Sequence, residues 1–125
     1  MIPACREFGI GLVPYSPPSD RILAGGILGA KNGCRADMAA KTEALKDKLD
    51  PYFKLCHSLG EAPADVAVAW VLHNPVVAAP IIGLRTMEQL TGCLRAVEIY
   101  LSEETLAKLD EIWPGPGEAP EAWAW

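Results

Sequence analysis

The sequence lacks an excess of positive charge, because its 11 Lys and Arg residues are outnumbered by 16 Asp and Glu residues. A chain with a net charge of -5 at pH 7 has no overall attraction to a nucleic-acid backbone or to anionic lipid. It also lacks any run of the roughly 18 apolar residues that a membrane-spanning helix needs. We therefore expect a cytoplasmic protein that binds neither nucleic acid nor membranes.

Closely spaced cysteines are absent too. The cysteines lie far apart, without the two-residue spacing of a zinc or redox site: Cys5, Cys34, Cys56 and Cys93. A chain of 125 residues does not need disulfide bonds for stability, so we expect reduced, buried thiols. Histidine is also scarce. His57 and His73 fall on apolar faces of predicted helices, where they are more often satisfied or solvated than catalytic, and no metal site is predicted.

Apolar residues, by contrast, make up 50% of the chain, enough for one domain with a substantial core. Short apolar runs at residues 10–13 and 76–82 predict two buried strands. Periodic patterns predict helices at residues 39–49, 51–59, 63–73, 87–99 and 103–112. Asp50 is expected to cap the second of these ahead of Pro51, although one helix kinked at Pro51 is an alternative. Glycine-rich residues 21–37 predict a long loop.

The alternation of strands and helices indicates the fold class. Strands separated by helices pair in parallel through right-handed crossovers, so we expect an α/β fold with about two parallel strands. Two strands are too few to cover this many apolar helices. A small doubly wound domain of the flavodoxin type would need several further strands, which the sequence does not show.

The stretch at residues 79–90 combines a strand end, a glycine turn and a helix start. The second predicted strand stops at Gly83, and Thr86 opens the next helix as an N-cap, with Gln89 completing a capping box. Free backbone N–H groups and the positive end of a helix dipole meet there beside Arg85, which predicts a phosphate site. Three apolar residues of this helix are expected to face the core: Leu90, Leu94 and Val97.

Four ordered motifs are similar to those of a known family. They are GIGLVPYSP at residues 9–17, AVAWVL at residues 67–72, IIGLRTMEQL at residues 81–90 and LSEE at residues 101–104. Together they resemble the C-terminal third of an aldo-keto reductase, a (β/α)8 barrel that uses NADPH to reduce carbonyl compounds. The resemblance implies that residues 1–125 run from the seventh strand through the eighth helix and tail of a TIM barrel, and are incomplete as a barrel.

The resemblance also implies roles for individual residues. Tyr15 would stack on the nicotinamide ring, while Ser16 and Pro17 would approach the pyrophosphate of NADP(H). Barrel enzymes often bind phosphate at the loops after strands 7 and 8. The residues that would line the adenosine 2'-phosphate pocket are Gly83, Leu84, Arg85, Thr86 and Gln89.

Each of these roles has a plainer alternative. Tyr15 at a strand end is also consistent with an aromatic residue at the rim of the fold. The Arg85 side chain has Glu88 and Glu98 nearby in the sequence as ion-pair partners. Gln89 has the capping box as a competing use.

The chain departs from the family pattern at several positions. Pro18 stands where the family usually has Leu, Arg21 where it has Gly, and Cys93 near where an Asn contacts adenine. The family's proton-donating Tyr and its Lys, Asp and His come from the first four strands, which have no counterpart here. Tyr52 and Tyr100 lack a Lys and an Asp placed as in the family motifs.

We therefore assign no catalytic residue to this chain and expect it to be inactive by itself. In a complete enzyme it would take part in the NADPH-dependent reduction of small aldehydes or ketones. The alternative is a stand-alone nucleotide-binding module or a self-associating scaffold, because the apolar helices need a partner or a second copy to cover them.

Overall fold

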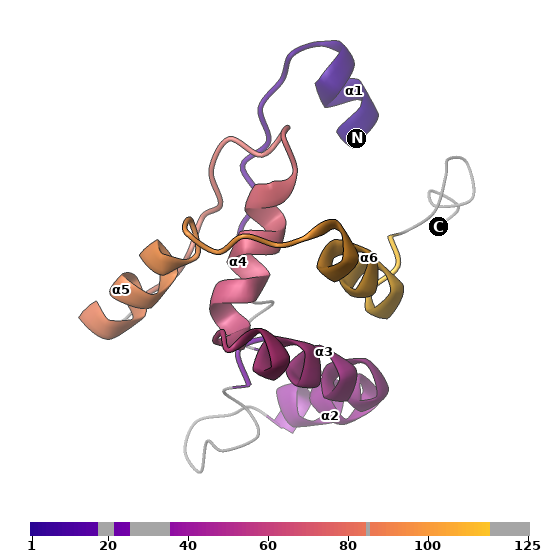
Figure 1. Ribbon diagram of the computed structural model, residues 1–125, viewed down its shortest axis with the longest axis vertical. Helices are drawn as coiled ribbons and strands as arrows, with labels where there is room; N and C mark the ends of the chain where they lie inside the picture. Colours follow the sequence, from indigo (N-terminus) through magenta and orange to yellow (C-terminus); the bar gives the residue numbers. More distant parts are fainter. Residues whose placement is uncertain (18–21, 26–35, 85, 116–125) are drawn as a thin grey trace.

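A central helix organises the molecule. The computed structural model describes residues 1–17, 22–25, 36–84 and 86–115. Its helices are α1 (Ile2–Glu7), α2 (Ala36–Ala44), α3 (Lys46–Leu59), α4 (Pro63–His73), α5 (Met87–Arg95) and α6 (Glu103–Ile112). Helix α4 stands in the middle, with α5 on one side and α6 on the other (Figure 1). Contacts join α4 to α3 and α5, and join α3 to α2 and α6.

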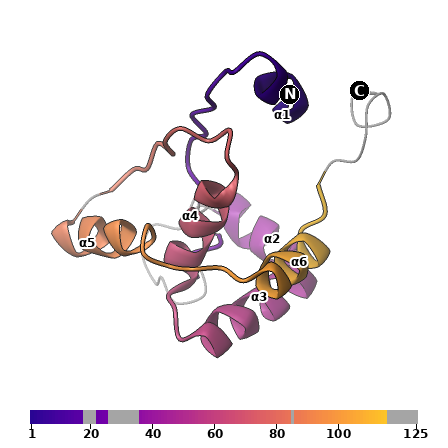
Figure 2. The ribbon, with the colours of Figure 1, turned by 45° about the horizontal axis from the view of Figure 1, so that its top comes forward.

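The hydrophobic core lies between α3, α4 and α6. Its buried cluster consists of Tyr52, Cys56, Val66, Ala69, Leu101, Leu106 and Leu109. Leu106 and Leu109 are three residues apart and so share the inner face of α6, as the sequence pattern predicts. Trp70 and Trp113 are half-buried against this cluster. Figure 2 shows α6 next to α3, and the two helices are in contact.

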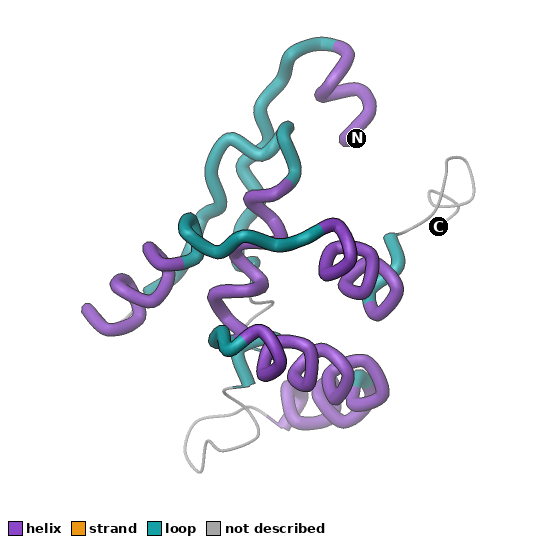
Figure 3. Tube along the Cα trace, in the orientation of Figure 1, coloured by secondary structure: helices purple, strands orange, loops and turns teal. Residues whose placement is uncertain are grey.

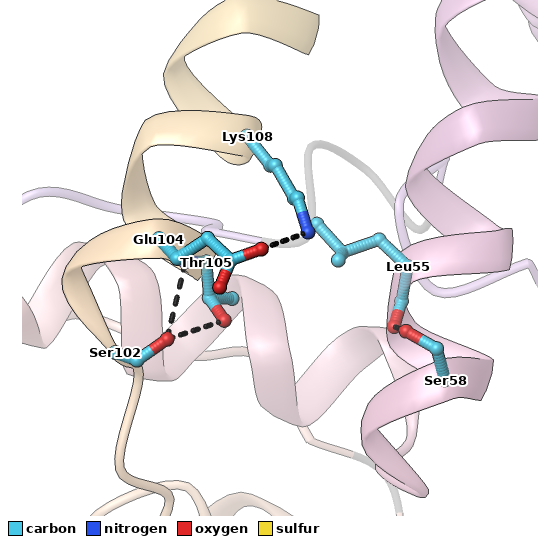
Figure 4. A network of polar contacts seen from close by, with 6 residues as sticks. All are labelled: Leu55, Ser58, Ser102, Glu104, Thr105 and Lys108. Carbon is cyan, nitrogen blue, oxygen red and sulfur yellow. Dashed lines mark hydrogen bonds and ion pairs between the residues drawn. The ribbon is translucent and has the colours of Figure 1, made fainter.

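The helix ends follow their sequence signals. Ser102 caps α6, since its Oγ accepts a hydrogen bond from the backbone N–H of Thr105 at 3.2 Å. One turn further, Lys108 Nζ donates to Glu104 Oε1 at 2.7 Å. Figure 4 shows these contacts across from Leu55 and Ser58 of α3, whose own hydroxyl-to-carbonyl bond is 2.7 Å. The predicted start of α4 and end of α3 are also confirmed.

Of the two alternatives at Pro51, a helix that continues through the proline is confirmed and a boundary at Asp50 is wrong, because Pro51 lies inside α3. The break falls at Leu45, and α2 begins at residue 36 rather than 39. The buried side chains of Leu49 and Tyr52 lie on either side of the proline and are 2% and 0% exposed. Their packing keeps the helix continuous through Pro51, at the cost of one backbone hydrogen bond.

The two predicted strands are also wrong as regular strands, although their parallel pairing is confirmed. Among the described residues they form only isolated parallel bridges, Leu12 with Val77 and Tyr15 with Ile81, and Figure 3 draws both segments as loops. The bonds are Leu12 N to Val76 O (2.6 Å), Ala78 N to Leu12 O (2.8 Å), Ile81 N to Pro14 O (2.7 Å) and Ser16 N to Ile81 O (2.8 Å). Prolines in both segments lack N–H donors, which prevents a continuous ladder.

The predicted inward face of α5 is a further correction. Leu90, Leu94 and Val97 are 36%, 61% and 70% exposed, and α5 has no buried residue. The helix ends at Arg95 rather than at residue 99. A pair of bridged segments is too narrow to offer the sheet surface against which such an apolar face packs.

Some predictions fall outside the described residues, among them Pro18, Arg21, Cys34, Arg85 and most of the predicted loop at residues 21–37. The three cysteines that are described are free thiols, with Cys5 and Cys56 buried as predicted and Cys93 half-buried. Within the described ranges, every helix is too short or too polar to cross a membrane.

Candidate functional site

The carboxyl ends of the two bridged segments meet at one place. Tyr15 is paired with Ile81, and Ser16 donates its backbone N–H to the Ile81 carbonyl at 2.8 Å. Gly83 follows two residues later and leads toward α5. The structure therefore brings two sequence-predicted groups, residues 15–17 and the glycine turn, to the same end of the parallel pair, where ligands bind in α/β folds.

The first segment presents an exposed aromatic ring and an unusual backbone conformation. The Tyr15 side chain lies open to solvent, with 81% of the residue exposed. Ser16 has φ of 51°, in the left-handed region that a non-glycine residue rarely adopts. Strained residues of this kind concentrate at binding loops, where the surrounding structure holds them. Pro17, next in the chain, is half-buried.

The N-terminus of α5 carries a hydroxyl cap and an acidic side chain. Thr86 caps the helix, and its Oγ1 accepts from the Gln89 backbone N–H at 3.3 Å. The Glu88 carboxylate accepts hydrogen bonds from its own backbone N–H and from the Thr86 hydroxyl, and these lower its pKa. The backbone N–H groups of a helix N-terminus are donors of the type that a phosphate group binds.

The remaining predicted residues of the turn differ in their exposure to solvent. Gly83 is exposed, and a Cβ at that position would have no atom within 4 Å. Leu84 is half-buried. Arg85, the charged residue predicted for this turn, lies outside the described residues. The turn is therefore open to solvent on the side of Gly83.

A polar contact between α5 and the start of α4 was not foreseen from the sequence. Arg95 donates to Glu61 twice, from Nε at 3.1 Å and from Nη2 at 2.9 Å. Asp65 is buried beside this pair, and an ideal Cβ on Gly92 would lie 3.5 Å from its Oδ1. Burial and the neighbouring Glu61 raise the pKa of Asp65, while Arg95 lowers it. The contact positions the helix whose N-terminus forms the candidate site.

The only sequence signal for this contact was indirect. Glu61 and Asp65 are four residues apart at the start of α4, and Arg95 occupies the last turn of α5. Nothing in the sequence pairs these two regions, because the pairing depends on how the helices pack. Cys93, on the same part of α5, has its pKa raised by burial and by the charge of Asp65.

The tyrosines and histidines do not gather at the candidate site. The Tyr52 hydroxyl is buried in the core and donates to the Pro63 carbonyl, and burial together with nearby Cys56 raises its pKa. Tyr100 is 85% exposed, and both His57 and His73 are exposed on other helices. Among the described residues, no three His, Cys, Asp or Glu side chains are grouped as a metal site would require.

Parallel-bonded segments joined by helices, with a helix N-terminus at their carboxyl ends, are features of the α/β class of proteins. The model of the aldo/keto reductase family matches residues 1–114. This chain belongs to that family, as its sequence motifs predict. The family has a (β/α)8 barrel, generally uses NAD(P)H and acts on small-molecule carbonyl substrates.

Curated relatives are similar along most or all of this chain. The uncharacterized oxidoreductase YrpG of Bacillus subtilis is 48% identical over 127 residues, which cover 100% of this chain and 39% of the relative. Norsolorinic acid reductase B of Dothistroma septosporum is 30% identical over 117 residues, covering 91% of this chain and 30% of the relative. Versiconal hemiacetal acetate reductase of Aspergillus parasiticus is 29% identical over 124 residues, covering 89% and 34%. The chain spans less than two fifths of these relatives.

Proposed function

We propose that this chain supplies the NADP(H)-binding loops of an aldo-keto reductase that reduces aldehydes or ketones in the cytoplasm. Tyr15 stacks on the nicotinamide, and Ser16 and Pro17 lie along the pyrophosphate. The 2'-phosphate pocket is lined by Gly83, Leu84, Arg85, Thr86 and Gln89. The observation that carries the proposal is the parallel pairing of Tyr15 with Ile81, which joins the two loops at one end.

In this proposal residues 1–125 are the segment of an incomplete barrel from its seventh strand to its eighth helix and tail. Bound NADPH supplies the hydride that reduces the carbonyl carbon. The chain's own part is to bind and orient the cofactor: the donors at the α5 N-terminus hold phosphate, and the Tyr15 ring fixes one face of the nicotinamide. The proton comes from residues outside this chain, so the chain alone is expected to be inactive.

A cofactor titration with the full chain tests the binding role. NADPH fluorescence is followed as the chain is added, with NADH as the comparison ligand. Tyr15→Ala is expected to weaken NADPH binding, while Tyr100→Ala removes an equally exposed tyrosine and leaves it unchanged. Equal effects of the two substitutions would count against a role for Tyr15.

The absence of activity is tested separately. NADPH oxidation is measured with a panel of aldehydes and ketones, using protein freed of any full-length reductase from the expression host. We expect no turnover above the rate without protein. Substrate-dependent oxidation by this chain alone would show that it holds its own proton donor.

A second candidate function follows from exposed apolar residues of α5 and the turn after it. Leu94 and Val97 are 61% and 70% exposed, which favours a module that associates with itself or with another protein. Light scattering on the purified chain distinguishes an associating module from the cofactor-binding function proposed above. A compact monomer would argue against an obligatory partner.

A further inference from the structure

The first turn of α4 carries a buried acid that faces α5. Asp65 is 8% exposed, and an ideal Cβ on Gly92 of α5 would lie 3.5 Å from its Oδ1 and 3.8 Å from its Oδ2. Within the described part of the chain, the Asp65 carboxylate accepts no hydrogen bond. A buried acid of this kind has lost water without gaining a partner, which disfavours its charged form.

Every helix that packs against Asp65 brings a titratable or charged group toward it. Glu61 lies just before α4, Cys93 and Arg95 come from α5, and Tyr52 comes from α3. Burial raises the pKa of Tyr52 and of Cys93, so both are neutral near pH 7. The charges that act on Asp65 at this pH are therefore those of Glu61 and Arg95.

The Arg95 guanidinium is already bonded to Glu61. Its Nε and Nη2 donate to the two Glu61 oxygens at 3.1 and 2.9 Å, so it attracts Asp65 through space without a hydrogen bond. The contact between α4 and α5 thus contains two carboxylates and one cation. An ionised Asp65 leaves one buried negative charge without a bonded partner, and such a charge weakens the contact that buries it.

We propose that Asp65 is a positioning residue for the nucleotide site. With a proton on its carboxylate, α5 is held firmly against α4; without that proton, α5 is held less firmly and its N-terminus binds a nucleotide phosphate less well. Nucleotide binding is then coupled to proton uptake by Asp65. This inference rests on the proposed function, since that function places the phosphate site at the N-terminus of α5.

The direction of the coupling follows from the environment of Asp65. Burial and the charge of Glu61 raise the pKa of Asp65, although Arg95 lowers it. Its contribution to the contact is therefore complete below the ordinary value of 3.8 and is lost as the pH rises through the raised value. The ionised carboxylate also repels a phosphate at the end of the same helix. Both effects weaken nucleotide binding as the pH rises.

Amide hydrogen exchange in the full chain tests the contact without any nucleotide. Protection factors in residues 87–95 are followed from about pH 4 to pH 7 for the wild type and for Asp65→Asn, which keeps the side-chain shape but has no charge. We expect a steeper loss of protection with rising pH in the wild type. Asp110→Asn removes an exposed carboxylate of α6 and should behave as the wild type. Parallel curves for the wild type and Asp65→Asn would overturn the proposal.

The two neighbouring charges should move the wild-type transition in opposite directions. Arg95→Gln removes the cation that favours ionised Asp65, so the transition should move to higher pH. Glu61→Gln removes a repelling charge and frees Arg95 to approach Asp65, so the transition should move to lower pH. If Asp65 were only a packing residue, both variants would loosen α5 without these opposite shifts.

Proton uptake connects the contact to the nucleotide. Adenosine 2',5'-bisphosphate is titrated into the chain by calorimetry in two buffers of different ionisation enthalpy, which together give the number of protons taken up. The wild type should take up more protons than Asp65→Asn, and Asp65→Asn should bind roughly fivefold more tightly at neutral pH. The ligand's own protonation is the same in both titrations, so the difference reports on Asp65. Equal uptake and equal affinity would contradict the coupling.

Other outcomes separate the role of Asp65 from the cofactor role. Nucleotide binding with equal proton uptake and parallel exchange curves overturns the role of Asp65 and leaves the cofactor role standing. Protection that depends on pH only while Asp65 is present, together with no nucleotide binding by either protein, supports the proton-dependent contact and contradicts the cofactor role.

Discussion

Arg95 of α5 and Glu61 at the start of α4 form a two-bond ion pair, with N–O distances of 2.9 and 3.1 Å. Such a bidentate pair has a defined direction as well as charge. This ion pair is important for the placement of α5, because the helix has no buried residue. The position of the α5 N-terminus, where the candidate phosphate site lies, therefore depends on a polar contact at the other end of the helix.

Breaking this pair should loosen α5. We expect Arg95→Ala to speed amide hydrogen exchange in residues 87–95, with the core helices α3 and α4 unchanged. Lys108→Ala is the matched control, because it removes an ion pair that joins residues of α6 only. High salt should reproduce part of the Arg95→Ala effect, since screening weakens an exposed pair. Unchanged exchange in α5 would show that Gly92 and its neighbours hold the helix without the ion pair.

The Glu88 carboxylate should compete with a phosphate ligand. Hydrogen bonds from its own backbone N–H and from the Thr86 hydroxyl lower its pKa, and its negative charge lies at the N-terminus of α5, where the phosphate is proposed to bind. We therefore expect Glu88→Gln to strengthen binding of adenosine 2',5'-bisphosphate, measured by calorimetry. Glu98→Gln removes the same charge beyond the end of α5 and should have a smaller effect. Weaker binding in Glu88→Gln would mean that Glu88 supports the turn rather than competing for it.

Tyr52 should be important for stability and not for chemistry. Its hydroxyl donates to the Pro63 carbonyl within the core. Tyr52→Phe removes this hydrogen bond, while the Pro63 carbonyl keeps its place in the first turn of α4, so the cost is about 0.5–1.5 kcal/mol of unfolding free energy. Urea unfolding measures the loss, and Tyr100→Phe, at an exposed tyrosine, should cost much less. A loss no larger than that of Tyr100→Phe would show that water replaces the missing hydroxyl.

Alkaline pH should destabilise the fold through Cys56. Burial raises the pKa of its thiol from 9.0 to about 11. Because the folded-state pKa is raised, this contribution to stability is complete below about pH 9 and is lost as the pH rises toward 11. At about 1.4 kcal/mol per pKa unit, the loss from this group approaches roughly 3 kcal/mol.

The measurement for this prediction is the unfolding free energy in urea at several pH values. Cys56→Ala should lower stability at pH 7, because it leaves a cavity, but should flatten the decline that begins near pH 9. Tyr52 also has its pKa raised by burial from an ordinary value of 10.0, so a second decline begins near pH 10, and the flattening in Cys56→Ala is confined to the range between pH 9 and 10. An unchanged slope in Cys56→Ala would place the pH sensitivity elsewhere.

Much of the helical structure could be read from the sequence. Ser102 and Thr86 cap their helices because each hydroxyl oxygen accepts a hydrogen bond from a backbone N–H that has no partner within the helix. Gly60 ends α3 with φ of +71°, a conformation that costs other residues free energy. The spacing of Leu106 and Leu109 predicted the inner face of α6. These features depend on neighbours within about four residues, and the sequence specifies those neighbours.

The residues of the candidate site were also found by sequence motifs, but their arrangement was not. Tyr15 and Ile81 are 66 residues apart in the chain, and only folding showed them paired in parallel. The Arg95–Glu61 contact had only an indirect sequence signal, because no local pattern pairs these two regions. Roles for Tyr15, Ser16, Pro17, Gly83, Leu84, Arg85, Thr86 and Gln89 stay predictions until cofactor binding is measured.

By itself, then, the sequence determined the family, the helix caps and the apolar faces, because each depends on local residue types and their spacing. The tertiary structure decided which of the apolar helix faces are buried against another element and which stay exposed. Leu49 and Tyr52 keep α3 continuous through Pro51 by packing, whereas Leu94 and Val97 stay exposed because two bridged segments give them no sheet to cover. The same apolar pattern produces a core or an open surface according to whether a partner surface is present, and that is a property of the whole fold.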